Sequence, residues 1–197
     1  MDITLYEMGT SRSLRCRWTL KEVGLEYKSI DDRSLIRSDE LKKIHPLGKM
    51  PAALIDGMPL FESSAICDYI ADQSKGVNLI AKSGTWSRAL HDQWVLFNYT
   101  ELEAWLWSTA VNTFVLPEDE RIPDCIPQNA KMFKKGAVAI DQYLANQDYF
   151  IGDIVKHKEF YYTANSKVPG TETFIDNQWS RLDSKPESGL TPNFEYK

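Results

Sequence analysis

Cysteine and histidine are scarce in this chain of 197 residues, which holds three of each. The cysteines, Cys16, Cys67 and Cys125, are odd in number and include no CxxC pair, so neither a disulfide framework nor a zinc site is predicted. The histidines lie far apart in the sequence, at positions 45, 91 and 157. We therefore expect no bound metal ion.

Long apolar segments and an excess of basic charge are also absent. No stretch reaches the roughly 18 apolar residues that cross a bilayer, so no membrane span is expected. The net charge of −5 argues against nucleic acid as a partner, because such proteins carry a clustered basic face. Residues 1–6 show no basic region or cleavage site of a signal peptide, and we expect a cytoplasmic protein.

The first part of the chain alternates between predicted strands and helices. We expect strand, helix, strand, helix, hairpin and helix at residues 2–6, 11–23, 27–30, 38–44, 52–61 and 63–72. Ser11 or Ser13 is expected to cap the first long helix, and Ser63 the last. The two crossovers indicate a sheet that begins parallel, and the hairpin adds an antiparallel pair. This is the order of a thioredoxin-like domain.

The second part is predicted to be helical. From Thr85 onward, apolar residues recur every three to four positions and indicate a long amphipathic helix, which is followed by another helix at residues 128–146. Residues 74–83 and 117–127 are predicted to be a linker and a loop. The interpretation is a first domain at 1–77, a helical domain at 85–153 and an atypical tail at 154–197.

Two motifs carry a resemblance to a known family. Residues 45–54 read HPLGKMPAAL and residues 60–70 read LFESSAICDYI. Together they resemble the glutathione transferase family, whose pattern is roughly N-P-x-G-x-V-P-x-L followed by L-x-E-S-x-A-I-x-x-Y. The resemblance is close over residues 1–77 and loose over 85–153. It implies an α/β thioredoxin-like N-terminal domain, an all-α C-terminal domain and a homodimer, with glutathione as cosubstrate and no other cofactor.

The second motif suggests how an anion is held. Ser63 and Ser64 are expected to begin a helix, where backbone N–H groups and the positive end of the dipole favour a carboxylate. Glu62, just before the helix, is placed to pair with an ammonium group. The γ-glutamyl end of glutathione carries both charges side by side, so Glu62 and Ser63 are candidate binding residues. The alternative is a capped helix beside a solvated acid.

The first motif suggests a backbone contact. The resemblance implies a cis peptide bond before Pro51, which leaves the N–H and C=O of Met50 open to an extended peptide that binds as an added strand. Lys49 is placed to meet a carboxylate. The alternatives are a simple turn proline and a solvated lysine.

The group that activates the glutathione thiol is expected in the loop after the first strand. The resemblance implies a hydroxyl or cysteine there, and the count back from Gly24 falls on Thr10, with Ser11 next to it. Tyr6 matches the tyrosine that other classes of the family use. Cys16 lies inside the predicted helix and is interpreted as a packed thiol. Ser11, Thr10 and Tyr6 are therefore the catalytic candidates.

Aromatic residues on the predicted long helix offer a place for a second substrate. Trp94, Phe97, Trp105 and Trp107 form a stripe that packs between helices or, at Trp105 or Trp107, walls a pocket for a small apolar electrophile.

These residues predict a transferase that joins the glutathione thiolate to an apolar electrophile. The alternative is a non-catalytic binding or assembly module of the same family, since threonine is a departure from the usual serine. A thiol-disulfide oxidoreductase is disfavoured, because the loop after Tyr6 holds no cysteine.

The tail departs from the family pattern. Residues 149–153 resemble the family's approach to a buried helix, but residues 154–157 lack the Ser/Thr-x-x-Asp capping box that opens it. Proline and glycine interrupt the rest of the chain, up to Lys197. We expect irregular structure beyond residue 153, low stability and reduced transferase activity.

Overall fold

The computed structural model describes residues 1–75, 77–145, 154–157, 160–164, 179–181 and 195–196. The chain divides into two compact units, one built mainly from Met1–Ile80 and the other mainly from Ala81–Ile154. No helix among these described residues is long and apolar enough to cross a membrane.

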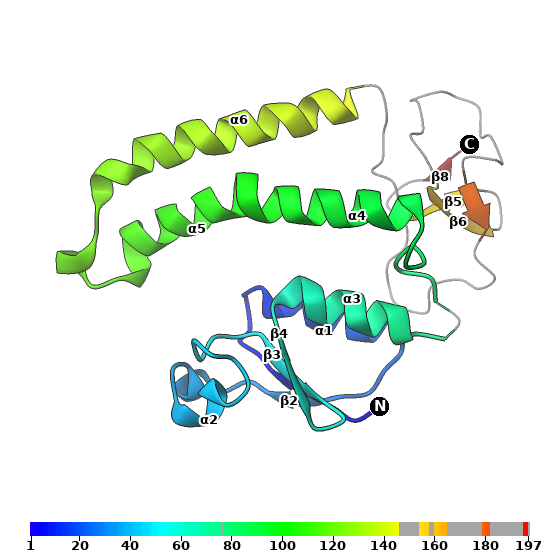
Figure 1. Cartoon of the computed structure of the whole chain (residues 1–197), viewed down its shortest axis with the longest axis horizontal. Coiled ribbons are helices and arrows are strands. Elements are labelled where there is room, and N and C mark those ends of the chain that lie inside the picture. The colour runs from blue at the N-terminus through cyan, green and yellow to red at the C-terminus, as the bar shows by residue number, and fades with distance from the viewer. Residues whose placement is uncertain (76, 146–153, 158–159, 165–178, 182–194, 197) are drawn as a thin grey trace. The chain divides into compact units, whose positions relative to one another are not determined.

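A four-stranded sheet forms the centre of the first unit (Figure 1). Its strands run in the order β2-β1-β3-β4 and comprise β1 (Ile3–Tyr6), β2 (Lys28–Ile30), β3 (Ala52–Ile55) and β4 (Met58–Phe61). The β1–β2 pair is parallel, and the other two pairs are antiparallel. The predicted mixed sheet is therefore confirmed.

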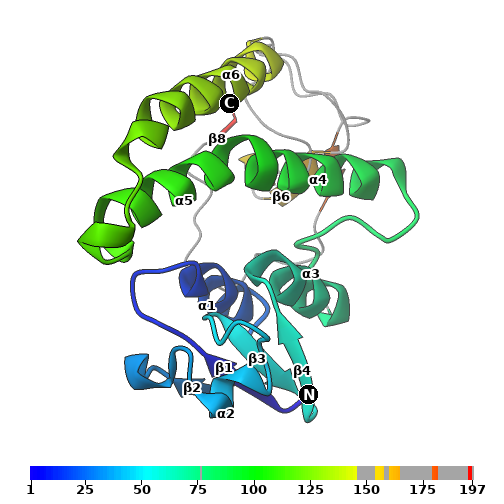
Figure 2. The ribbon, with the colours of Figure 1, turned by 60° about the vertical axis from the view of Figure 1, so that its left-hand side comes forward.

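Helices cover both faces of this sheet (Figure 2). Side chains alternate between the faces of a strand, so Leu5 packs on one side and Tyr6 on the other. On the Leu5 side lie α1 (Ser13–Glu22) and α3 (Ser63–Gln73), through Leu20 and Ile66 among others. On the Tyr6 side lies α2 (Asp39–Lys42), preceded by the short 3-10 helix η1 (Arg33–Leu35). This is the expected thioredoxin-like α/β domain.

The expected caps of α1 and α3 are wrong. Arg12 is the N-cap of α1, because Ser11 lies one residue too early, while Ser13 is already helical. Glu62 is the N-cap of α3, and Ser63 is its first helical residue. The Ser63 hydroxyl accepts a hydrogen bond from Arg15 instead of capping its own helix.

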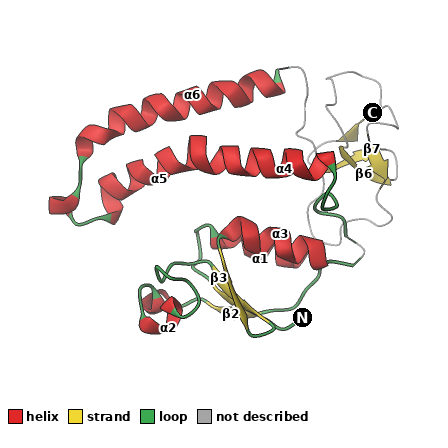
Figure 3. Ribbon diagram, viewed as in Figure 1, coloured by secondary structure: helices red, strands yellow, loops and turns green. Residues whose placement is uncertain are grey.

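One long helical rod opens the second unit (Figure 3). It consists of α4 (Trp86–Phe97), a π-helical stretch η2 (Asn98–Glu103), α5 (Ala104–Ala110) and a second π-helical stretch η3 (Val111–Val115). Thr85 caps it by accepting a hydrogen bond from the backbone N–H of Arg88 at 3.2 Å. The predicted long helix from Thr85 is therefore confirmed, although two stretches of it are π-helical.

The second predicted helix is α6 (Ile126–Leu144), which begins two residues earlier than expected. Pro127 fits within the first turn of a helix, since the missing N–H has no acceptor there. The loop before α6 contains two short 3-10 helices, η4 (Glu118–Glu120) and η5 (Pro123–Cys125).

Few side chains of the second unit are buried. Of the described residues from 81 to 145, only Asn129 and Gly136 are classed as buried. The Asn129 amide donates to the hydroxyls of Ser108 at 2.9 Å and Thr109 at 3.3 Å, which ties α6 to α5. The helical unit is thus joined by a few hydrogen bonds of a buried polar side chain and has little enclosed apolar core.

Short strands occur in the tail, so irregular structure is the wrong expectation for its described residues. A second sheet runs in the order β7-β6-β5-β8 and comprises β5 (Ile154–His157), β6 (Phe160–Ala164), β7 (Trp179–Arg181) and β8 (Glu195–Tyr196). The β-branched and aromatic residues of β5 and β6 favour strands, a propensity that the proline and glycine pattern obscured. Residues 149–153, with the resemblance noted there, lie outside the described residues.

Candidate functional site

Three segments with candidate residues meet at one end of the first sheet. Tyr6, at the end of β1, pairs with Ala52, at the start of β3, and Ala52 pairs with Phe61, at the end of β4. The loop after β1, the Lys49–Pro51 segment and the start of α3 therefore all leave the sheet at this same end. Pairing register thus gathers residues from Tyr6 to Phe61, which are 55 positions apart in the sequence.

The N-termini of α1 and α3 lie next to each other at this end. Arg15, in the first turn of α1, donates from Nη1 to the Ser63 hydroxyl at 3.3 Å. The Cys16 thiol donates to the Ser63 carbonyl at 3.6 Å. Sequence analysis missed Arg15, because 48 positions separate it from Ser63 and no local motif marks it.

Hydrogen bonds shape the loop between β1 and α1. The Ser11 hydroxyl donates to the Met8 carbonyl at 2.6 Å and accepts from the backbone N–H of Ser13 at 3.2 Å. The exposed Thr10 side chain makes no hydrogen bond to another described residue. Thr10 is therefore free to donate to an incoming group, while Ser11 has to turn away from Met8 to do so.

Tyr6 and Glu7 are both buried at the start of this loop. Tyr6 is 7% exposed and packs with Leu41 and Ile44 on the α2 side of the sheet. Glu7 is 1% exposed, and its carboxylate accepts from Arg17 Nε and Nη2, each at 2.8 Å. This ion pair with Glu7 raises the pKa of Arg17. The pair anchors the loop, whereas the packing of Tyr6 favours a structural role for that ring.

A close backbone contact fixes the approach to Met50. Gly48 has φ +57°, and a Cβ atom there would lie 2.7 Å from the Arg37 Cα, so only glycine fits. The Arg37 N–H donates to the Gly48 carbonyl at 2.8 Å. The Met50–Pro51 peptide bond is cis, as the resemblance implied. Lys49 is exposed and Met50 is half-buried.

His45 supports the same turn from inside. Its ring is 5% exposed and lies 4.8 Å, between centroids, from the ring of Phe61. Its Nδ1 accepts from the Leu47 N–H at 3.0 Å. Burial holds the pKa of His45 below its ordinary value, so the ring is neutral at physiological pH.

The start of α3 combines an exposed acid with helix amides. Glu62 is exposed and has φ 69°, and its carbonyl accepts from the Ile66 N–H at 3.0 Å. The amides of Ser64 and Ala65 precede this first intrahelical bond and so have no acceptor within the helix. The helix has 11 residues, long enough for a dipole that favours an anion at this point. A carboxylate and an ammonium group therefore both find complementary partners here.

The aromatic stripe of the second unit separates into two kinds of residue. Trp94 packs on Phe97, with ring centroids 5.4 Å apart, and on Tyr143 of α6 at 4.3 Å. Trp94 therefore packs between α4 and α6, and Phe97 packs against it within α4. Trp105 is half-buried and Trp107 is 40% exposed, both on α5.

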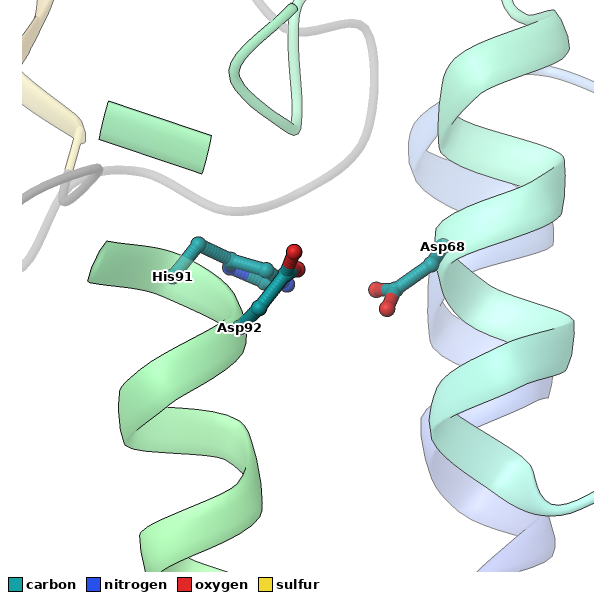
Figure 4. Close-up of side chains that lie close together, drawn as sticks. All are labelled: Asp68, His91 and Asp92. Atoms are coloured by element: carbon teal, nitrogen blue, oxygen red, sulfur yellow. The ribbon is translucent and has the colours of Figure 1, made fainter. Parts of the chain in front are cut away.

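Acidic and histidine side chains also occur on α3 and α4. Figure 4 shows Asp68 on α3, and His91 and Asp92 on α4. Asp68 belongs to the first unit and the other two to the second, and the positions of the units relative to each other are not determined. Within the second unit, Arg88 Nε donates to Asp92 at 3.3 Å and balances its charge.

Comparison with known proteins identifies relatives of both parts of the chain. Residues 1–72 match the family model described as glutathione S-transferase, N-terminal domain. The probable glutathione S-transferase GSTF1 of Oryza sativa subsp. japonica is 26% identical over an alignment of 201 residues, gaps included. This alignment covers 89% of this chain and 87% of that protein. Elongation factor 1-gamma 2 of the same plant is 28% identical over 134 residues, or 66% of this chain and 30% of that protein.

A solved structure agrees with these matches. Glutathione S-transferase I from maize, determined in complex with an atrazine glutathione conjugate, superposes with a TM-score of 0.62 and 26% identity over 78% of this chain and 74% of that one. Glutathione is the cosubstrate of such transferases. Through its motifs, its first sheet and these relatives, the chain is similar to the glutathione transferase family, and residues 1–72 match that family's N-terminal domain.

Proposed function

We propose that this chain is a glutathione transferase that joins the thiolate of glutathione to a small apolar electrophile. The observation that carries the proposal is the strand register. It brings the hydroxyl loop after β1, the Lys49–Pro51 segment and the start of α3 to one end of the sheet. A tripeptide with a charged end and a central thiol needs three such contacts at once.

The γ-glutamyl end of glutathione is assigned to the start of α3. Its carboxylate takes hydrogen bonds from the first amides of the helix and from the Ser63 hydroxyl, where the helix dipole adds to the attraction. Its ammonium group pairs with Glu62. Arg15, which contacts the Ser63 hydroxyl, adds a positive charge beside this carboxylate. Because the carboxylate and the ammonium group of the ligand each meet a partner of opposite charge, the ligand binds in one orientation.

The backbone of glutathione is assigned to Met50. A peptide that runs beside this residue forms hydrogen bonds to its N–H and C=O as an added strand. Lys49 is exposed on the same segment and meets the carboxylate at the other end of the tripeptide. The thiol is thereby directed toward the loop after β1.

The hydroxyl of Ser11 or Thr10 is assigned to the thiolate. A free thiol has a pKa near 8.5, and a hydrogen-bond donor at the start of a helix lowers it. Once formed, the thiolate sulfur attacks an electrophilic carbon of the second substrate. In a substitution, the bond between that carbon and its leaving group breaks. In an addition to a double bond, the neighbouring atom takes up a proton from water. We further propose that residues 85–153 form the helical domain, in which Trp105 or Trp107 contacts an apolar ligand.

A glutathione titration by calorimetry, followed by turnover of an aryl halide, tests this proposal. We expect saturable binding and turnover by the wild type, and weaker binding by Glu62→Ala. The absence of any glutathione binding would overturn the assigned site.

A second candidate is a non-catalytic binding or assembly module. The match to a protein named as an elongation factor favours it, as does the sparse burial in the helical unit. Glutathione binding without turnover, over a range of aryl and alkyl electrophiles, would support this module over the enzyme.

We also propose that the chain is a cytoplasmic homodimer. Its described cysteines are free, as is usual for proteins of a reducing compartment. Light scattering after size-exclusion chromatography measures the mass in solution. A mass near twice 22.6 kDa supports the dimer, and the monomer mass contradicts it.

A further inference from the structure

Two of the three cysteines meet inside the first unit. Cys16 on α1 and Cys67 on α3 are 51 positions apart in the sequence, yet their sulfur atoms lie 4.0 Å apart. Cys16 is fully buried in the core, and Cys67 packs half-buried against the same core. The proposed transferase chemistry uses neither thiol.

The two thiols differ in reactivity, because their surroundings differ. The hydrogen bond to Cys16 lowers the pKa of Cys67, with a further contribution from the Thr19 hydroxyl, while burial opposes both. The same contact, together with burial, raises the pKa of Cys16. Cys67 is therefore the nucleophile of the pair, and its partial exposure admits a small reagent.

We propose that Cys16 and Cys67 form a reversible disulfide that joins α1 to α3 when the protein meets a peroxide. The sulfurs have to approach from 4.0 Å to about 2 Å, and we expect a rotation of the half-buried Cys67 side chain to bring them together. Both helices already pack on each other over the same core, so their backbones need little movement.

Hydrogen peroxide is the oxidant in this reaction. The Cys67 thiolate attacks one peroxide oxygen, the O–O bond breaks and hydroxide leaves, which gives a sulfenic acid at Cys67. The Cys16 sulfur then attacks the Cys67 sulfur, the S–O bond breaks, and the Cys16 proton leaves with the hydroxyl as water. Two thiols are oxidised to one disulfide, and one peroxide is reduced to water. A dithiol reductant reverses the change by thiol–disulfide exchange.

The disulfide would form next to the first turn of α3. Cys16 donates to the Ser63 carbonyl in the reduced protein, and this hydrogen bond is lost when its proton leaves. The covalent link restricts the unfolded chain and so raises the melting temperature of the first unit. The proposed disulfide requires neither glutathione nor the proposed transferase activity.

Mass spectrometry of the whole chain, after treatment with a small excess of hydrogen peroxide, tests this pair. We expect the wild type to lose the mass of two hydrogen atoms and to regain it with a dithiol reductant. Cleavage after glutamate places Cys16 in residues 8–22 and Cys67 in residues 63–101, and these peptides should appear joined. The oxidised protein should also melt at a higher temperature than the reduced one.

Two variants give the controls. Cys125→Ser, which removes the third thiol, should form the same linked peptides, whereas Cys67→Ser should keep both remaining thiols reduced. Cys67 is only half-buried, so its serine variant is expected to fold, and circular dichroism checks this. Gain of oxygen at Cys67 without a linked peptide, or a disulfide that includes Cys125, would overturn the proposal.

Discussion

At the scale of single residues, the buried ring of His45 links the turn before Met50 to the pH of the solution. Its pKa is lowered from the ordinary 6.5, first by burial, and also by the positive charge of Lys49, although Glu62 opposes the shift. As the pH falls, His45 therefore binds a proton at a higher pH in the unfolded chain than in the folded one. The stability that the neutral ring confers is complete above pH 6.5 and is lost as the pH falls through the lower, folded-state pKa.

We accordingly predict that the free energy of unfolding in urea decreases between about pH 7.5 and about pH 5.5. In His45→Asn this decrease should be smaller, because asparagine does not titrate and can still accept from the Leu47 N–H. Equal pH slopes in the two proteins would show that His45 is not the group responsible.

Glu62 is predicted to hold the ammonium group of glutathione. Removal of one charge-assisted contact, worth about 1.5–3 kcal/mol, should weaken binding of glutathione to Glu62→Ala by about tenfold or more. Glu26→Ala is the matched control, because Glu26 is also exposed but lies before β2, at the opposite end of the sheet. Calorimetry measures both, and a similar loss in the two variants would point to net charge alone.

Ser63→Ala is predicted to weaken the same binding by a different route. The Ser63 hydroxyl is buried and accepts from Arg15, so its removal takes a donor from the ligand and releases the guanidinium. The loss should again correspond to about 1.5 kcal/mol or more. Unchanged affinity in both Glu62→Ala and Ser63→Ala would remove the site from α3.

The thiolate prediction separates three hydroxyls. We expect Ser11→Ala or Thr10→Ala to raise the pKa of bound glutathione, because these residues precede α1, whose positive end adds to their effect. Tyr6→Phe should leave that pKa unchanged, since the ring is packed with Leu41 and Ile44. Thiolate absorbance against pH measures all three, and a shift in Tyr6→Phe alone would reverse the assignment.

At the scale of elements, the contact between α6 and the long rod depends on Gly136. A Cβ atom there would lie 2.6 Å from the Glu101 carbonyl oxygen in η2. Alanine in place of glycine ordinarily stabilises a helix by about 1 kcal/mol. Here we predict the opposite sign, a loss of about 1–3 kcal/mol, because backbone cannot move aside as a side chain can.

Urea unfolding of Gly136→Ala, followed by circular dichroism, measures this loss. Ala130→Gly, at an exposed position of the same helix, is the control and should cost about 1 kcal/mol through propensity alone. If Gly136→Ala is more stable than the wild type, α6 can move away from the long rod without a cost in free energy.

At the scale of the whole molecule, the two units differ in how much they bury. The first unit encloses Leu5, Leu20, Ile66 and Ile70, whereas the described part of residues 81–145 buries only Asn129 and Gly136. Because local opening is easiest where few apolar contacts are made, we predict weaker amide protection in α4, α5 and α6 than in β1, β3 and α3. Hydrogen exchange with mass spectrometry measures it, and equal protection would indicate a core that assembly or the tail completes.

Local pattern was enough to predict the element types of the first unit and the long helices of the second. Alternation in strands and a period near 3.6 in helices are properties of neighbouring residues, so they are visible in the sequence. The turn at Gly48 and the acid before Ser63 are likewise local, and they carried the resemblance to the family. The tail was misjudged, because weak strand propensity competes there with frequent proline and glycine.

By itself, then, the sequence determined the order of the main elements up to residue 145, the resemblance to the family and the segments that hold the candidate site. Only the tertiary structure decided that Arg15 contacts Ser63, that Tyr6 is packed away and that Cys16 meets Cys67. The physical reason is that these contacts join residues that are far apart in the chain, through strand register and helix packing. No periodicity within one element records which distant side chain will face it.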